Sequence, residues 1–224
     1  MDSNFKITHF DPNIDSEESL REAVEKAYAT NREFFGQDME IRVNFLYTRE
    51  EMDQLLNQKT AGWVVGNTVN SEVNIFSPEV FDKVSPHPKT NFPFTLAHEM
   101  AHLFIQKVCG SRYPKWLMEG LPGQVAGQYQ NKKLAKEQVR DFATLHTPRD
   151  WDNKPGYYQA FLFTHYLFEH FGKEQLLGFY KSLKWNNSYD EFKEEFAKKF
   201  GASFDDCQKD WVATLEDENA KMTA

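Results

Sequence analysis

The chain lacks several features that would assign it to other classes of protein. Its 2 cysteines are too few for the disulfide framework of a small secreted domain. We expect Cys109 and Cys207 to be free thiols, although the sequence leaves a bond between them open. No stretch approaches the roughly 18 apolar residues of a membrane span, and the N-terminus lacks the pattern of a signal peptide. We therefore expect a cytoplasmic protein that does not act at a membrane, or a secreted protein whose signal was removed.

An excess of basic charge is also missing. The chain has 26 lysines and arginines against 34 aspartates and glutamates, which gives a net charge of −8 and a pI near 5.4. Nucleic acids and anionic membranes attract basic surfaces, so neither is an expected partner. The composition, 40% hydrophobic and 15% aromatic, is sufficient for a substantial core. The sequence has no internal repeat, and we expect one compact domain that is a monomer.

The most informative stretch is His98-Glu-Met-Ala-His102. A helix turns about 100° per residue, so the two imidazoles lie one turn apart on the same face and can bind one metal ion. Glu99 lies beside them, where its carboxylate can accept a proton from water. The alternative is a pair of ordinary core histidines. However, residues 92–105 read FPFTLAHEMAHLFI, and an unpaired carboxylate in such an apolar helix would cost several kcal/mol.

A third candidate ligand follows at Glu119, in the stretch PKWLMEGL. Trp116 and the apolar residues around it predict that Glu119 lies near the start of a buried helix. Two imidazoles and a carboxylate, with a fourth position open, form the ligand set of a catalytic zinc ion. We therefore expect one Zn²⁺ per chain, bound by His98, His102 and Glu119.

The combination of HEMAH and WLMEG resembles the gluzincin metallopeptidases, in which HExxH is followed after a short loop by W-x-x-E-G. The stretch Gly156–Gly172 is similar to the tyrosine-led helix of gluzincin aminopeptidases and of the wider peptidase-MA-like domains. Residues Ser203–Leu215 resemble the closing helix of such domains. The resemblance covers roughly residues 60–215.

The resemblance implies zinc-dependent hydrolysis of a peptide or protein substrate. Glu99 would act as the general base, and Tyr157 would donate a hydrogen bond to the oxyanion. Tyr158 is the alternative if the alignment is off by one residue. His165 and His146 are the reserve candidates for the oxyanion donor.

The chain departs from the family pattern just after the third ligand. Relatives continue E-G-L-A-E-Y, whereas this chain has E-G-L-P-G-Q, so Pro122 is expected to bend the second helix. Relatives often orient a zinc histidine with an acid four or seven residues after the ligand, but these positions are Gly123 and Ala126 here. We expect Gln124, Gln128 or a backbone carbonyl to take that role.

The resemblance leaves the substrate open. No motif that would capture a substrate amino terminus is recognisable, which favours an endopeptidase over an aminopeptidase. Two alternatives remain: a zinc hydrolase that acts on another bond, and a non-catalytic binding or sensor module that retains the metal site. In gluzincins an edge strand before the zinc helix pairs with the substrate, and residues 72–77 are expected to fill that place.

The hydrophobic pattern changes near residue 90. Before it, alternation predicts strands at 5–10, 41–47, 63–65 and 73–76. A first helix is expected to end at Gly36, and a second to begin after Thr48 and run to Leu56. From residue 93 the pattern predicts helices at about 93–108, 115–128, 132–143, 156–171, 173–183, 189–200 and 203–216.

These elements predict an α+β fold. Residues 1–90 are expected to form a small mixed or antiparallel sheet lobe packed on the zinc-binding helix. Residues 91–224 are expected to supply that helix and a mainly helical lobe, with an active-site cleft between the two lobes.

Overall fold

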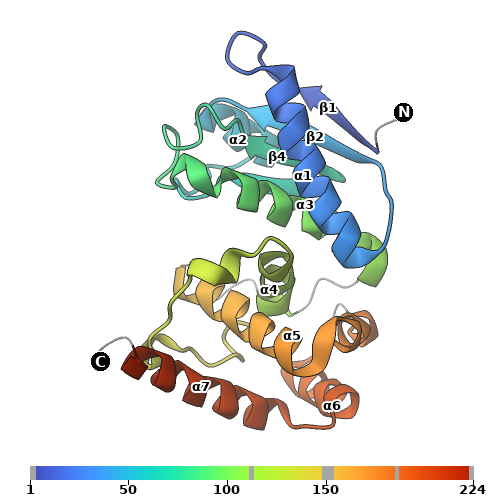
Figure 1. Ribbon diagram of the computed structural model, residues 1–224, viewed down its shortest axis with the longest axis vertical. Coiled ribbons are helices and arrows are strands. Elements are labelled where there is room, and N and C mark those ends of the chain that lie inside the picture. Colours follow the sequence, from blue (N-terminus) through green and yellow to red (C-terminus); the bar gives the residue numbers. More distant parts are fainter. Residues whose placement is uncertain (1–3, 111–113, 148–153, 185–186, 222–224) are drawn as a thin grey trace. The chain divides into compact units, whose positions relative to one another are not determined.

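The computed structural model describes residues 4–110, 114–147, 154–184 and 187–221. It has the predicted α+β fold, and its chain divides into two compact units, Met1–Phe104 and Ile105–Ala224 (Figure 1). Among the helices in these ranges, none combines the length and apolar character that crossing a membrane requires.

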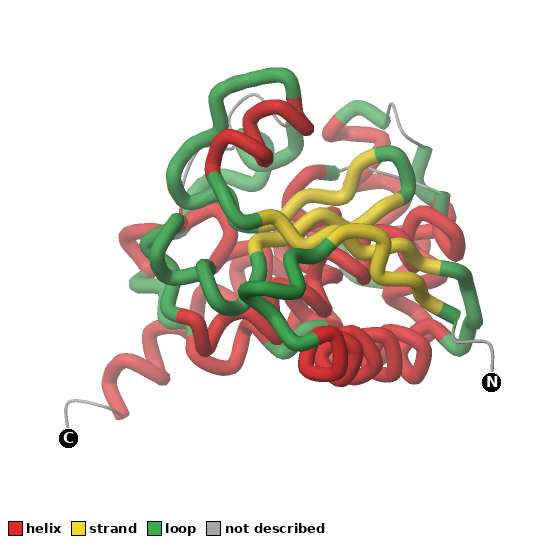
Figure 2. Tube along the Cα trace, turned by 90° about the horizontal axis from the view of Figure 1, so that it is seen from above, coloured by secondary structure: helices red, strands yellow, loops and turns green. Residues whose placement is uncertain are grey.

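The first unit is built on a four-stranded mixed sheet in the order β1-β2-β4-β3 (Figure 2). The strands β1 (Phe5–His9), β2 (Ile41–Leu46) and β4 (Glu72–Phe76) run parallel, and β3 (Gly66–Val69) is antiparallel to β4. The expectation that residues 72–77 form an edge strand is therefore wrong. β4 pairs with β2 on one side and β3 on the other, so β3 lies at the edge.

Two helices pack on the same face of this sheet (Figure 1): α1 (Glu17–Phe35) and α3 (Phe92–Cys109). Phe5 lies opposite Ile41 in register, and side chains two residues apart on a strand share a face, so Phe5 and Phe45 point the same way. The ring of Phe5 contacts Tyr28 of α1 at 6.3 Å, and that of Phe45 contacts Phe92 of α3 at 6.4 Å between centroids. The first contact holds α1 against the sheet, and the second holds α3.

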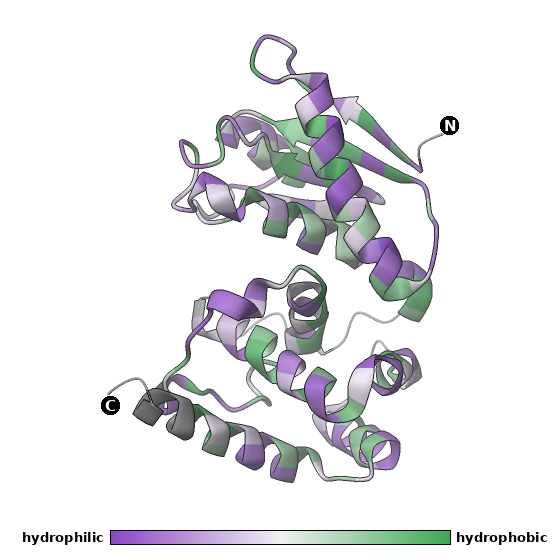
Figure 3. Cartoon of the chain, in the orientation of Figure 1, coloured by the Kyte–Doolittle hydropathy of each residue, from purple (hydrophilic) through white to green (hydrophobic). Residues whose placement is uncertain are grey.

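The helix boundaries in this unit follow local signals. Along α1, hydrophilic and hydrophobic residues alternate, whereas β2 and β4 are mainly hydrophobic (Figure 3). The helix ends at Gly36, whose φ of 65° is left-handed, as the sequence predicts. Thr48 and Glu51 form a reciprocal capping box that starts α2 (Arg49–Leu56). Both predicted boundaries are confirmed.

The strand predicted at residues 63–65 is wrong, because β3 begins only at Gly66. The segment before it is held by a distant side chain. The guanidinium of Arg49 donates to the carbonyl oxygens of Gly62 at 2.8 Å and Val64 at 2.5 Å. These bonds satisfy the two carbonyl oxygens without a neighbouring strand.

The second unit is helical and aromatic. Its main helices are α4 (Lys115–Val125), α5 (Lys154–Ser182), α6 (Tyr189–Phe200) and α7 (Phe204–Lys221). Trp116 is fully buried, with ring centroids 5.0 to 5.9 Å away on Phe142, Phe163, Phe192 and Phe204. The helices predicted at 156–171 and 173–183 are the two parts of α5, which is interrupted at Gly172.

The helix predicted at 132–143 is wrong, since only Lys136–Gln138 forms a short 3₁₀ turn there. The buried side chain of Gln159 accepts from the backbone N–H of Arg140 and donates to its carbonyl oxygen, both at 2.8 Å. This side chain therefore satisfies the backbone groups that a helix would otherwise use. The expected helix at 115–128 is also shorter and ends at Val125.

Two glycines bring α4 and α5 close together. A Cβ at Gly120 would lie 2.0 Å from Thr164 Oγ1, and a Cβ at Gly123 would lie 2.2 Å from the ring of Phe161. Pro122 lies within α4 between these contacts. The stretch E-G-L-P-G therefore makes the surface on which α5 packs.

We expect Gly123→Ala to destabilise the protein by about 1–3 kcal/mol, because the added methyl group cannot fit beside Phe161 without moving a helix. Urea unfolding measures this change. Gly178→Ala is the matched control on α5, where only the flexible end of Lys199 lies nearby. It should be neutral or slightly stabilising. Equal effects of the two substitutions would contradict the packing described.

Candidate metal centre

The candidate metal centre begins with two histidines on α3. His98 and His102 are separated by one helical turn, and their ring centroids are 4.9 Å apart with 80° between the planes. His98 is 6% exposed, while His102 is half-buried. Because residues at i and i+4 share a face of a helix, both imidazoles project into the same region.

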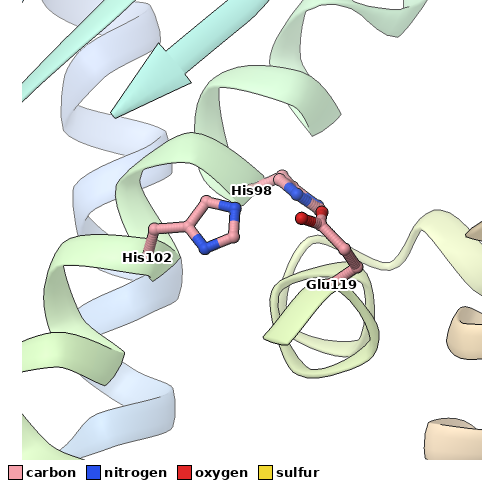
Figure 4. A group of neighbouring side chains, drawn as sticks. All are labelled: His98, His102 and Glu119. Atoms are coloured by element: carbon pink, nitrogen blue, oxygen red, sulfur yellow. The ribbon is translucent and has the colours of Figure 1, made fainter. Parts of the chain in front are cut away.

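Glu119 of α4 joins these histidines (Figure 4). One ligand atom from each of the three residues lies within 4.8 Å of the others. Figure 4 shows the carboxylate and the two imidazoles pointing toward one another. The structure thus brings together the three predicted ligands in a group that could hold a metal ion.

The chemistry of this donor set fits a metal ion. Two imidazole nitrogens and one carboxylate oxygen are the ligands found in open, catalytic metal sites. Ligand atoms about 2.1 Å from a common ion lie about 3–4 Å from each other, so small side-chain rotations would close the group around one ion.

A lysine that was not predicted from the sequence contacts this group. Lys115 forms an ion pair with Glu119 one turn further along α4, and their side chains are 17% and 7% exposed. A carboxylate as buried as this one would be strongly destabilising without a compensating partner. The i, i+4 spacing in PKWLME was a signal that could have revealed the pair.

Glu99 lies next to His98 on α3 and is half-buried. Its carboxylate lies beside the edge strand β3, where Thr68 Oγ1 is 3.2 Å from Glu99 Oε2. The predicted base is therefore fixed within the first unit by a strand as well as by its own helix.

Tyr157 lies near the start of α5, with a half-buried ring. That ring packs on Phe161 with 6.1 Å between centroids. Tyr158 has a different environment, since the Nζ of Lys132 lies 5.0 Å from its ring centroid. The two tyrosines are therefore distinguishable by their contacts, as the helix period predicts.

The two reserve histidines are held by structural contacts. The Nδ1 of His165 lies 3.1 Å from Gln124 Oε1, and its ring stacks on Tyr129 with centroids 3.8 Å apart. His146 packs on Phe192, and burial lowers the pKa of its imidazole and so favours the neutral form. Its carbonyl oxygen also accepts from the N–H of Lys115, which helps to start α4.

Two of these contacts concern residues that were expected to orient the candidate ligands His98 and His102. Gly123 has no room for the acidic side chain of the family pattern, because the ring of Phe161 occupies that space. Gln124, one of the expected substitutes, is paired with His165. The role expected of Gln128 stays a prediction.

Comparison with known proteins adds no assignment to this geometry. No family model matches the chain, and no curated protein matches its sequence.

Lys115→Met tests how the pair with Glu119 affects metal binding. Without a bound metal the substitution removes a positive charge that compensates a buried carboxylate, and with a bound metal it removes a positive charge near a cation. Both effects favour the bound state. We therefore expect the affinity for Zn²⁺ to rise by about tenfold or more, as measured by competition with a fluorescent chelator.

Two control variants accompany this experiment. Lys193→Met removes a more exposed ion pair with Asp205 in the same unit and should leave the affinity unchanged. His102→Ala removes a ligand and should abolish tight binding. Unchanged or weaker binding by Lys115→Met would show that the lysine does not oppose metal binding.

Proposed function

We propose that this chain is a zinc-dependent peptidase of the gluzincin type. The observation that carries the proposal is the group formed by His98, His102 and Glu119, with Glu99 on the same helix as the two histidines. The donor set suits Zn²⁺, which would polarise a substrate carbonyl and lower the pKa of a water molecule towards about 7. Most side chains around Glu99 on α3 are apolar and buried.

Glu99 is the proposed general base. It follows a ligand directly in the helix but points about 100° away from it, so its carboxylate need not bind the metal. It would accept a proton from the attacking water and deliver that proton to the leaving amine. Thr68 restricts where this carboxylate can lie.

The edge strand β3 is the proposed docking place for an extended peptide. A peptide can add to a sheet only where a strand has unpaired backbone groups on one side. In this sheet β3 has that position, and Glu99 lies beside it. Binding along the length of a strand does not require a substrate terminus, which supports an endopeptidase over an aminopeptidase.

Tyr157 is the proposed donor to the oxyanion. It lies near the N-terminal end of α5, and its half-buried ring is steadied by Phe161. A phenol held in this manner could donate to the negative charge that forms on the carbonyl oxygen.

Glu99→Gln separates hydrolysis from metal binding. The variant should keep about one zinc per chain and its fold, but lose cleavage of a proteome-derived peptide library whose amino termini are acetylated. The wild type should cleave this library, and a chelator should stop it. Zinc binding without turnover by the wild type would favour a hydrolase of another bond or a non-catalytic module. An active Glu99→Gln variant would place the chemistry elsewhere.

Tyr157→Phe tests the oxyanion donor. The phenol would act only on charge present in the transition state, so kcat should fall by about 10²–10³-fold with little change in KM. Tyr158→Phe is the matched control and should remain active, since its ring lies against Lys132. A loss at Tyr158 in place of Tyr157 would move the assignment by one residue.

A further inference from the structure

Two residues of the edge strand β3, Gly66 and Thr68, lie next to Glu99. Gly66 lies opposite Ile75 of β4 in the sheet register, and Thr68 lies opposite Val73. Ile75 in turn lies opposite Phe45, whose ring contacts Phe92 of α3. Since residues two apart on a strand share one face, Gly66 and Thr68 both face the side of the sheet on which α3 packs.

Thr68 contacts Glu99 at two points. Its hydroxyl donates to the backbone carbonyl oxygen of Glu99 at 2.8 Å, and the same oxygen atom lies 3.2 Å from the carboxylate Oε2. The shorter bond ties the helix backbone to the strand, while the longer contact limits the side chain. Both act on the residue proposed as the general base.

The side chain of Glu99 occupies the space next to Gly66 that a side chain at position 66 would need. A Cβ at this position would lie 2.7 Å from Glu99 Cγ and 3.2 Å from both Cδ and Oε1. The backbone gives no other reason for a glycine, because Gly66 does not have a positive φ. Glycine is otherwise depleted in strands, so the space it leaves is the feature to explain.

We propose that Gly66 and Thr68 are positioning residues that set the place of the Glu99 carboxylate. Gly66 leaves the space that the side chain of Glu99 fills. The hydroxyl of Thr68 limits the position of the Glu99 Oε2 atom. The inference rests on the proposed hydrolytic function. Its consequence is that one strand has two roles: its outer edge would hold the substrate backbone, and its inner face fixes the base.

Gly66→Ala is the direct test. The added methyl group must displace the Glu99 side chain, and a misplacement of about 1 Å can lower turnover by about 10²-fold. We expect kcat to fall by 10–100-fold while KM changes less than about twofold and zinc content stays the same. Gly62→Ala is the matched control on the segment before β3. A Cβ there meets nothing within 4 Å, and its activity should be unchanged.

Thr68→Val tests the second contact with a side chain of the same shape. We expect a loss of about tenfold in kcat, and Thr68→Ser, which keeps the hydroxyl, should restore most of it. A purely structural role of Thr68 would instead lower thermal stability without this pattern in kcat. Wild-type kcat in both Gly66→Ala and Thr68→Val would overturn the proposal.

A double-mutant cycle decides the same question without turnover. Gly66→Ala should lower Tm by a few degrees in the presence of Glu99, and this loss should vanish in a Glu99→Ala background. Equal losses in both backgrounds would overturn the proposed contact. If the wild type hydrolyses no peptide, the proposed function fails, and the cycle still decides whether β3 holds Glu99.

Discussion

Polar and charged groups that are buried require partners, and the arrangement around Glu119 follows from this constraint. Glu119 is 5% exposed and lies close to two imidazoles, one of them equally buried. Lys115 forms an ion pair with this carboxylate and supplies a compensating charge. A divalent ion bound by the same carboxylate would supply that charge more directly. The three side chains therefore form a group that could hold a metal ion, and Lys115 competes with such an ion for the carboxylate.

Close packing explains two positions that have no side chain, Gly123 and Gly66. On α4, the position of the expected acid is Gly123, and the ring of Phe161 fills its space. An acidic side chain would not fit at this position, because α4 and α5 approach closely through Gly120 and Gly123. On β3, Gly66 likewise leaves room for Glu99. In each case a glycine on one element leaves space that a side chain of a neighbouring element fills.

The elements that could be predicted carry their own signals. Gly36 ends α1 with a left-handed residue, Thr48 caps α2, and α6 spans the predicted residues 189–200. The failures at residues 63–65 and 132–143 have a common cause. Their backbone groups bond to the side chains of Arg49 and Gln159, which are distant in the sequence. A pattern of neighbouring residues contains no information about such partners.

The sequence alone determined that His98, Glu99 and His102 lie on one apolar helix and that the two imidazoles share a face, because the helical period relates residues four apart. Only the tertiary structure decided that Glu119 lies beside them, that β4 is internal to the sheet, and that Gly66 and Thr68 face Glu99. These relations depend on strand register and on how helices pack. Both are set by contacts between residues far apart in the chain, which local spacing does not specify.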